Sequence, residues 1–496
     1  MIKSNGGIIG PDNVTTGGAF GSASGVFKLG EVTNLIKESK WPTAGPQGFQ
    51  VANSCRFNDG SSDYLNRTSS STGNKKTFTI SYWCKRGNLT LGNTSTALSS
   101  GNFSNGDNHT YVGFQLNTDT ARIQNTVSGS TVMSLISTAL YRDVSAWYHF
   151  VWKVDTTQST ESDRVKLYVN GVEQTISGTY PTQNQDTFFG SDDTYRVGVR
   201  FLASATYWDG YLAEVCYVDG SALAPTSFGE FNSQTGIWVP KVVTGLTFGT
   251  NGFYLPFTNS GALGEDFSGN NNDFTVNNLT SLDQSTDTCS TNFATINPLY
   301  VGLNANFGIS EGNLKGLNSG AGDNNYVNNF GVSSGKWYVE AKATMSGNAY
   351  GTIGIVATDS VLQTNGSWLG STNDSWYYSQ NGHIGTSGGS TSTGHATYTT
   401  GDIISVALNL DDNELLWYKN GAVQNSGTAT SITANKTYFI GGRVYDTSTG
   451  WEFNFGSPMY AISSGNTDGN GFGNFEYAVP TGFLSLNTKN LAAVLA

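Results

Sequence analysis

Short runs in which hydrophobic and polar residues alternate recur along most of this chain. The first clear runs cover residues 78–84, 148–154 and 165–169, and a later one covers 211–218. Because successive side chains of a strand point to opposite faces of a sheet, each run predicts a strand with one buried face. Antiparallel strands of this kind, joined by loops, predict a β-sandwich in the first half of the chain.

The same pattern returns in the second half, at residues 337–342, 404–410, 415–419 and 451–455. Asn170-Gly171 follows the run that ends at residue 169, and Asn420-Gly421 follows the run that ends at residue 419. Asn-Gly between alternating runs predicts a type I′ hairpin turn, because both residues tolerate a positive φ. The chain is therefore predicted to be all-β, with two tandem antiparallel jelly-roll sandwiches.

The less regular parts of the sequence set the predicted domain boundaries. Residues 1–48 are Gly-rich, with one helix predicted at Glu31–Lys40 before Pro42, and are interpreted as an attachment segment. Residues 49–225 form the first predicted sandwich, and 298–496 form the second. Residues 226–297 are predicted to be an ordered connector wrapped on both domains, since they hold too many aromatic residues for a free linker.

Composition narrows the classes of function. Only 12 % of the 496 residues are charged, and the net charge of −12 leaves no basic cluster for nucleic acid. No stretch approaches the ~20 apolar residues of a membrane span, and the first residues lack the apolar core of a secretory signal. The four cysteines lack metal-ligand spacing; Cys55 and Cys216 could lie near each other, but buried free thiols are expected.

Two sets of motifs resemble known families. Phe57–Tyr64, Phe78–Trp83, Trp147–Phe150, Val165–Gly171 and Asp209–Val215 together resemble the laminin-G/concanavalin-A-like jelly roll. Ser334–Glu340, Gly351–Ile355, Gly401–Ala407, Trp417–Gly421 and Phe453–Gly456 together resemble an SPRY domain. Both resemblances imply lectin-like modules that bind ligands through loops at one rim.

Three shorter motifs, Gly6–Pro11, Phe228–Trp238 and Asn292–Pro298, resemble virion proteins of tailed bacteriophages. This resemblance implies a tail-fibre-, spike- or decoration-like structural protein that docks on other virion proteins through residues 1–48. The expected location is the surface of the phage particle, after synthesis in the host cytoplasm. A homo-oligomer is expected, although no coiled-coil heptads set the number of copies.

The sequence offers little for catalysis. Glycoside hydrolases with concanavalin-like folds place two carboxylates on one strand face, and that spacing is missing here. The nearest candidates are Glu214 with Asp219 and Glu161 with Asp163, which are more simply explained as surface carboxylates. The protein is therefore predicted not to be an enzyme.

Candidate ligand-binding residues are aromatic side chains off the predicted core strands, which suit stacking against a sugar ring. They are Tyr195, Tyr207, Trp208, Trp368, Trp376 and Tyr445. The laminin-G resemblance also implies calcium, with loop carboxylates as candidate ligands: Asp59, Asp63, Asp192, Asp193 and Asp209. The alternative is that these aspartates form turn hydrogen bonds, and no other cofactor is predicted.

These observations lead to the hypothesis of a phage virion protein that displays non-catalytic domains to bind host-surface glycan or protein. The first alternative is a purely structural capsid or tail protein that decorates or cements its neighbours. The second alternative is a polysaccharide depolymerase.

Overall fold

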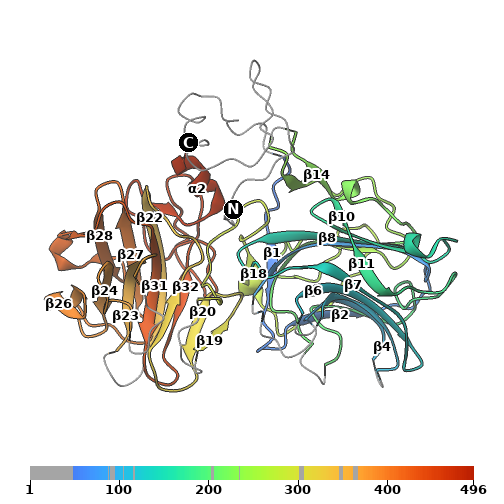
Figure 1. Ribbon diagram of the computed structural model, residues 1–496, viewed down its shortest axis with the longest axis horizontal. Coiled ribbons are helices and arrows are strands. Elements are labelled where there is room, and N and C mark those ends of the chain that lie inside the picture. Colours follow the sequence, from blue (N-terminus) through green and yellow to red (C-terminus); the bar gives the residue numbers. More distant parts are fainter. Residues whose placement is uncertain are drawn as a thin grey trace, which may run out of the picture.

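The computed structural model describes residues 48–495, apart from 88, 90–94, 104–105, 116–117, 203–205, 234, 301–306, 346–349 and 361–366. The predicted attachment segment, including the helix expected at Glu31–Lys40, lies outside the described residues up to residue 47. Two β-sandwiches lie side by side, the first in blue to green and the second in yellow to red (Figure 1). The predicted all-β class with two antiparallel jelly-roll sandwiches is confirmed.

Two eight-stranded sheets form the first sandwich. In spatial order, sheet I contains β10 (Val172–Gln174), β9 (Val165–Val169), β8 (Trp147–Asp155), β3 (Thr77–Arg86), β13 (Gly210–Asp219), β1 (Ser54–Phe57) and β18 (Gln284–Ser285), with β16 (Phe253–Leu255) also paired to β13. Sheet II contains β11 (Ile176–Thr179), β7 (Ser130–Leu140), β6 (Thr120–Val127), β5 (Asn108–Phe114), β4 (Ser95–Asn102), β12 (Thr194–Val197), β2 (Tyr64–Thr68) and β17 (Thr275–Asn277).

The core between these sheets comes from the predicted inward faces. Phe78, Ile80, Tyr82 and Cys84 alternate along β3 and are all fully buried in it. Cys55 faces the same core, whereas Cys216 lies in a separate cluster on the outer face of sheet I. The two thiols are thus separated by the sheet, and all four cysteines are free.

Residues 226–297 contribute more to the first sandwich than the predicted connector would. They supply β16, β17 and β18, which pair with β13, β2 and β1. Phe253, Leu255 and Phe274 join the first core, while Ile296 joins the second. This sandwich therefore extends beyond residue 225, because three later strands are added to its sheets. A separate hairpin, β14 (Gly229–Phe231) with β15 (Trp238–Pro240), precedes them.

The second sandwich packs a nine-stranded sheet on a six-stranded one. Sheet III contains β19 (Phe307–Ser310), β20 (Lys315–Asn318), β32 (Gly450–Asn454), β22 (Lys336–Thr344), β27 (Ile403–Asn409), β28 (Glu414–Lys419) and β29 (Ala422–Val423), with β30 (Thr430–Ser431) paired to β28 and β33 (Leu484–Ser485) paired to β22. Sheet IV contains β21 (Asn324–Val327), β31 (Tyr438–Val444), β23 (Thr352–Ala357), β24 (Ser375–Ser379), β25 (Ile384–Thr386) and β26 (Gly389–Ser392). Helix α2 (Thr488–Leu495) follows β33.

Both predicted hairpin turns are present. Asn170 and Gly171 have φ of 48° and 78°, and Asn420 and Gly421 have φ of 47° and 77°. These values match a type I′ turn, which joins β9 to β10 and β28 to β29. In the described part of the chain, no helix is both long enough and apolar enough to cross a membrane.

The two sandwiches meet where β19 and β20 lie beside β1 and β18 (Figure 1). The turn between β19 and β20 carries Glu311, whose carboxylate lies 3.6 Å from Arg56 Nε and accepts a hydrogen bond from Asn58 Nδ2 (2.7 Å). Tyr211 of β13 donates its hydroxyl to the Gly312 carbonyl in the same turn (3.0 Å). Polar bonds from three strands of sheet I therefore hold the second sandwich, since the Ser285 and Ser457 hydroxyls also lie 2.8 Å apart.

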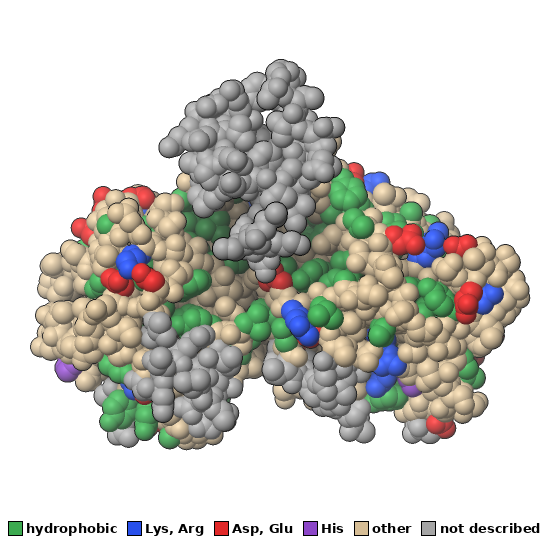
Figure 2. Space-filling view, viewed as in Figure 1, with side chains coloured by type: hydrophobic (Ala, Val, Ile, Leu, Met, Phe, Trp, Pro, Cys, Tyr) green, Lys and Arg blue, Asp and Glu red, His purple; other side chains and the backbone are tan. Residues whose placement is uncertain are grey.

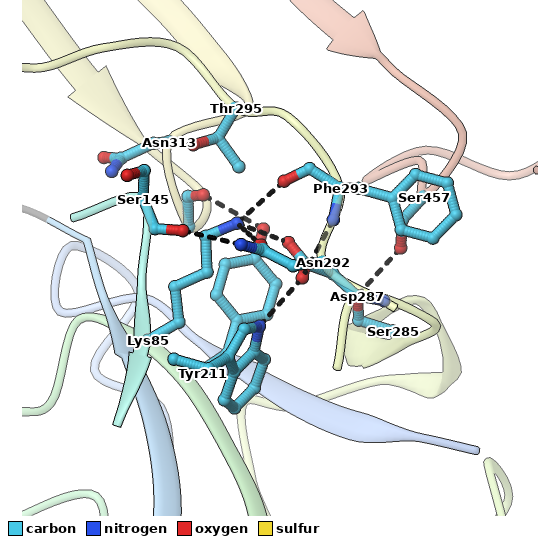
Figure 3. A network of polar contacts seen from close by, with 12 residues as sticks. Lys85, Ser145, Tyr211, Ser285, Asp287, Asn292, Phe293, Thr295, Asn313 and Ser457 are labelled. Carbon is cyan, nitrogen blue, oxygen red and sulfur yellow. Dashed lines mark hydrogen bonds and ion pairs between the residues drawn. The ribbon is translucent and has the colours of Figure 1, made fainter. Parts of the chain in front are cut away.

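A buried ion pair lies at this junction. Lys85 Nζ of β3 lies 2.8 Å from each of Asp287 Oδ2, Asn292 Oδ1 and the Phe293 carbonyl (Figure 3). Trp147 Nε1 donates to the other Asp287 oxygen (3.0 Å). The two charged side chains are 1 % and 2 % exposed, so the pair is satisfied by protein groups and not by bulk water.

Candidate functional site

Three of the predicted ligand-binding residues lie inside the cores. Tyr195 and Trp208 pack between sheets I and II, and Trp376 packs between sheets III and IV. Tyr195 of β12 and Trp376 of β24 are at strand positions whose side chains point inward. The backbone N–H of Trp208 donates to the Gly198 carbonyl (2.7 Å). The expectation that these rings are exposed is therefore wrong.

The predicted calcium ligands do not gather around one point. Asp63 is buried, and its carboxylate accepts hydrogen bonds from the Asn58 N–H (2.9 Å) and the Ser61 hydroxyl (2.7 Å). Burial raises the pKa of Asp63 to about 6. Among the residues that the structure describes, no three His, Cys, Asp or Glu side chains form a group that could hold a metal ion. Asp59, Asp192, Asp193 and Asp209 thus form no carboxylate cluster with Asp63.

The candidate catalytic carboxylates have other contacts. Asp219 accepts the backbone N–H groups of Asn74 (2.7 Å) and Asn251 (3.0 Å), which anchors two loops. Glu214 lies at a bulge of β13 with a positive φ of 49°, and it accepts the Tyr254 hydroxyl (2.6 Å). Burial raises the pKa of Glu214 to about 7. Glu161 and Asp163 are exposed in a short 3-10 helix, Glu161–Asp163.

Ser81 and His149 form a buried contact, but His149 is not arranged to act as a base for this serine. Ser81 Oγ lies 2.8 Å from His149 Nε2, and the Trp238 indole N–H donates to His149 Nδ1 (3.0 Å). Since Nδ1 accepts a proton donor, Nε2 carries the ring proton and donates it to Ser81. Burial lowers the pKa of His149 to about 3, and Trp83 and Trp238 stack on the ring. This neutral imidazole cannot activate the serine.

Two other predicted ligand-binding residues, Trp368 and Tyr445, are brought together in the second sandwich. Both rings surround the Arg443 guanidinium of β31, with its carbon 5.1 Å and 5.8 Å from the ring centroids. Tyr350, which the sequence patterns did not single out, supplies a third ring at 5.5 Å. We call these four residues the Arg443 cluster.

In the Arg443 cluster the guanidinium is buried and hydrogen-bonded, whereas two of the three rings are exposed to solvent. Arg443 is opposite Asn325 of β21 and Thr352 of β23 in sheet IV. Its guanidinium donates to Asp323 and to the Tyr350 carbonyl (2.6 Å). Its side chain is only 9 % exposed, whereas Tyr350 and Tyr445 are 47 % and 38 % exposed, with ring centroids 5.3 Å apart. The result is an exposed aromatic surface whose rings are fixed by a buried cation.

Tyr207, the remaining predicted ligand-binding residue, is half-buried on the first sandwich, with its ring 6.3 Å from that of Tyr64. It lies beside β2 of sheet II, whereas the Arg443 cluster is built on β31 of sheet IV. Of the six predicted aromatic residues, three therefore lie in the two cores, two lie in the Arg443 cluster, and Tyr207 lies on the surface of the first sandwich.

Comparison with known proteins agrees with this division of the chain. A family model described as the concanavalin A-like lectin/glucanases superfamily, of laminin-G type, matches residues 59–225, and an SPRY domain model matches 336–457. The search of curated proteins finds no match.

Several solved structures are similar to single domains of the chain. The SPRY domain of human HERC1 is 17 % identical, with 32 % of this chain and 96 % of that chain covered and a TM-score of 0.27. The native heptameric SAP-like pentraxin from Limulus polyphemus is 16 % identical, with 36 % and 75 % covered and a TM-score of 0.25. The TRIM65 PSpry domain is 11 % identical, with 32 % and 89 % covered and a TM-score of 0.26.

The family models and the sheet topology lead to the same assignment. Each model covers a segment that supplies most strands of one of the two sandwiches. Such domains are typically binding modules, and neither match indicates a particular enzyme family. The chain thus carries a laminin-G-type domain of the concanavalin A-like lectin superfamily followed by an SPRY domain.

Proposed function

We propose that this protein is a non-catalytic, lectin-like binding protein that holds a glycan on the Arg443 cluster. The exposed pair of rings at Tyr350 and Tyr445 carries the proposal. Aromatic faces of this kind bind the apolar face of a sugar, and the hydroxyl tips of both tyrosines can bond its hydroxyl groups. Asp323 holds the Arg443 guanidinium, and that guanidinium lies against both rings. Because the rings are ordered beforehand, little side-chain entropy is lost when the sugar binds.

Removing both exposed rings tests this proposal. We expect Tyr350→Ala with Tyr445→Ala to weaken binding to host-surface polysaccharide about tenfold, since an aromatic contact contributes about 0.5–1.5 kcal/mol beyond its buried area. The measurement is a titration of purified protein against intact cells and extracted polysaccharide. Phe267→Ala is the matched control, because Phe267 is 48 % exposed on the first sandwich. Unchanged binding by a folded double variant would contradict the proposal.

The biological setting is also a proposal: the protein is a component of a tailed-phage particle, synthesised in the host cytoplasm and mounted as a homo-oligomer. The short motifs Gly6–Pro11, Phe228–Trp238 and Asn292–Pro298 support it, and residues 1–48 are the proposed attachment to other virion proteins. Locating the chain by antibody labelling of intact particles tests this setting.

Particles assembled without the protein separate the remaining alternatives. Loss of adsorption would support host binding. Normal adsorption by fragile particles would favour the purely structural role. Release of reducing ends from host polysaccharide, abolished by one carboxylate substitution, would instead establish a depolymerase.

A further inference from the structure

A row of polar side chains crosses the outer face of sheet II, and the segment that follows β12 covers its middle. Ser99 and Tyr111 there are at most 1 % exposed, and the Ser99 hydroxyl donates to the Val199 carbonyl (2.7 Å). Strand register aligns Arg196 of β12 with Asn66 of β2 and Ser99 of β4, and then aligns Ser99 with Tyr111 of β5. The row continues across the sheet through Gln124 of β6 and Ser134 of β7. Their chain neighbours Leu65, Leu98, Val112, Ile123 and Leu135 lie in the core, so the row faces away from sheet I.

Three arginines gather on this face without an acidic partner. Arg122, Arg196 and Arg200 form no ion pair with any carboxylate in the described part of the chain. Arg86 is paired with Asp119 and Arg443 with Asp323, whereas Arg67 donates to the Asn272 amide oxygen. On the surface displayed in Figure 2, some Lys and Arg side chains lie beside Asp or Glu and others do not.

Aromatic rings hold these guanidinium groups in place. Arg196 lies 4.1 Å from the centroid of Phe103, and Arg200 lies 4.3 Å and 4.5 Å from those of Tyr111 and Phe201. The Nε atoms of Arg122, Arg196 and Arg200 are buried and have no hydrogen-bond partner among the described residues. A stacked guanidinium keeps its N–H donors at its edge, where they can form two parallel bonds to a carboxylate.

Burial and the repulsion between neighbouring guanidinium groups both make the charged arginines of this face less stable. Burial lowers the pKa of Arg196, and burial together with the charge of Arg122 lowers the pKa of Arg200. A bound anion would offset both costs, because it neutralises the positive charge of the cluster.

We propose that this arginine face, defined by Arg122, Arg196 and Arg200 with Tyr64 and Tyr207, is a second binding site, and that it takes an anionic sugar. The guanidinium groups would bind the carboxylate or phosphate, and the two half-buried tyrosine rings would lie against the sugar ring. The Ser134 hydroxyl accepts a hydrogen bond from Arg122 (3.1 Å) and can still donate one to a sugar hydroxyl. A nucleic acid is disfavoured, since its dense phosphates would be repelled by the net charge of the protein.

Binding to defined polymers tests the site. The probes are polygalacturonate for a carboxylate, a glycerol-phosphate teichoic acid for a phosphate, and neutral dextran. We expect binding to one or both anionic polymers, weakened by salt, with none to dextran. Arg196→Gln with Arg200→Gln should weaken it at least about tenfold, because hydrogen bonds to charged groups are the stronger ones. Arg122→Gln, on β6 of the same sheet, is a second test if the double variant melts early.

Two control variants make the result specific. Arg142→Gln removes one exposed charge, 58 % exposed beside Asp119, and should leave binding unchanged. Tyr350→Ala with Tyr445→Ala should also retain anionic binding, so failure at this face is distinguishable from failure at the Arg443 cluster. The proposal is overturned by equal binding to dextran, by insensitivity to all three arginine substitutions, by equal loss with Arg142→Gln, or by a preference for duplex DNA.

Discussion

Replacing Asp287 with alanine should lower the free energy of unfolding by about 3–5 kcal/mol at pH 7, the range for breaking a buried ion pair by removing one partner. The substitution leaves the Lys85 ammonium, 1 % exposed, without its counter-charge. It also removes the acceptor of the Trp147 indole N–H. Urea unfolding followed by tryptophan fluorescence measures the change.

A surface pair provides the matched control for Asp287. Asp163 lies 3.3 Å from Lys166 and its side chain is 48 % exposed, so Asp163→Ala should change stability by less than about 1 kcal/mol. Lys85→Met combined with Asp287→Ala should be less destabilising than Asp287→Ala alone, because no charge is then left buried. A loss for Asp287→Ala no larger than the control's would show that water enters the junction.

Replacing Glu214 with glutamine should stabilise the protein by about 3 kcal/mol at pH 8 and leave stability unchanged at pH 4. The pKa of Glu214 rises from an ordinary value of 4.5 to about 7 in the folded chain because the carboxyl is buried. Between these values the folded state holds a proton that the unfolded state has released. Stability therefore falls as pH rises through this window, and the full cost is present above it.

Glutamine is neutral at every pH, and its side-chain oxygen can still accept the Tyr254 hydroxyl. The difference between wild type and Glu214→Gln therefore isolates this one group from Asp63 and Glu340, whose pKa values burial also raises, to about 6 and about 7. The measurement is unfolding of both proteins between pH 4 and 8. A difference that does not depend on pH would contradict the prediction.

Most of the fold follows from single-strand patterns. Where a strand is long, as β3 and β22 are, the alternating residues that predict it also identify its buried face. The short strands of residues 226–297 escaped prediction because two or three residues, as in β16 or β18, are too few to show a period. Their place is fixed by pairing with strands far away in the chain.

The binding surfaces were only partly predictable for a related reason. Trp368 and Tyr445 were identified as aromatic loop residues, but Arg443 and Tyr350 join them only through the pairing of β31 with β23 and the loops beside it. Arg122, Arg196 and Arg200 lie on different segments, and only the register of sheet II brings them together. For Tyr195 and Trp208 the prediction of an exposed ring was wrong. Tyr195 lies on the short strand β12, and both side chains point into the core.

The late strands of the first sandwich also affect its synthesis. Strand β1 pairs with β18, and the Ser54 hydroxyl bonds to the Asp287 carbonyl, 233 residues further on. At about 5–20 residues per second, a ribosome needs roughly 12–47 s to cover that distance. Throughout this interval the nascent domain carries an open edge at β1, to which another chain could add a strand. Completion of the first sandwich thus waits until the ribosome is about to begin the second.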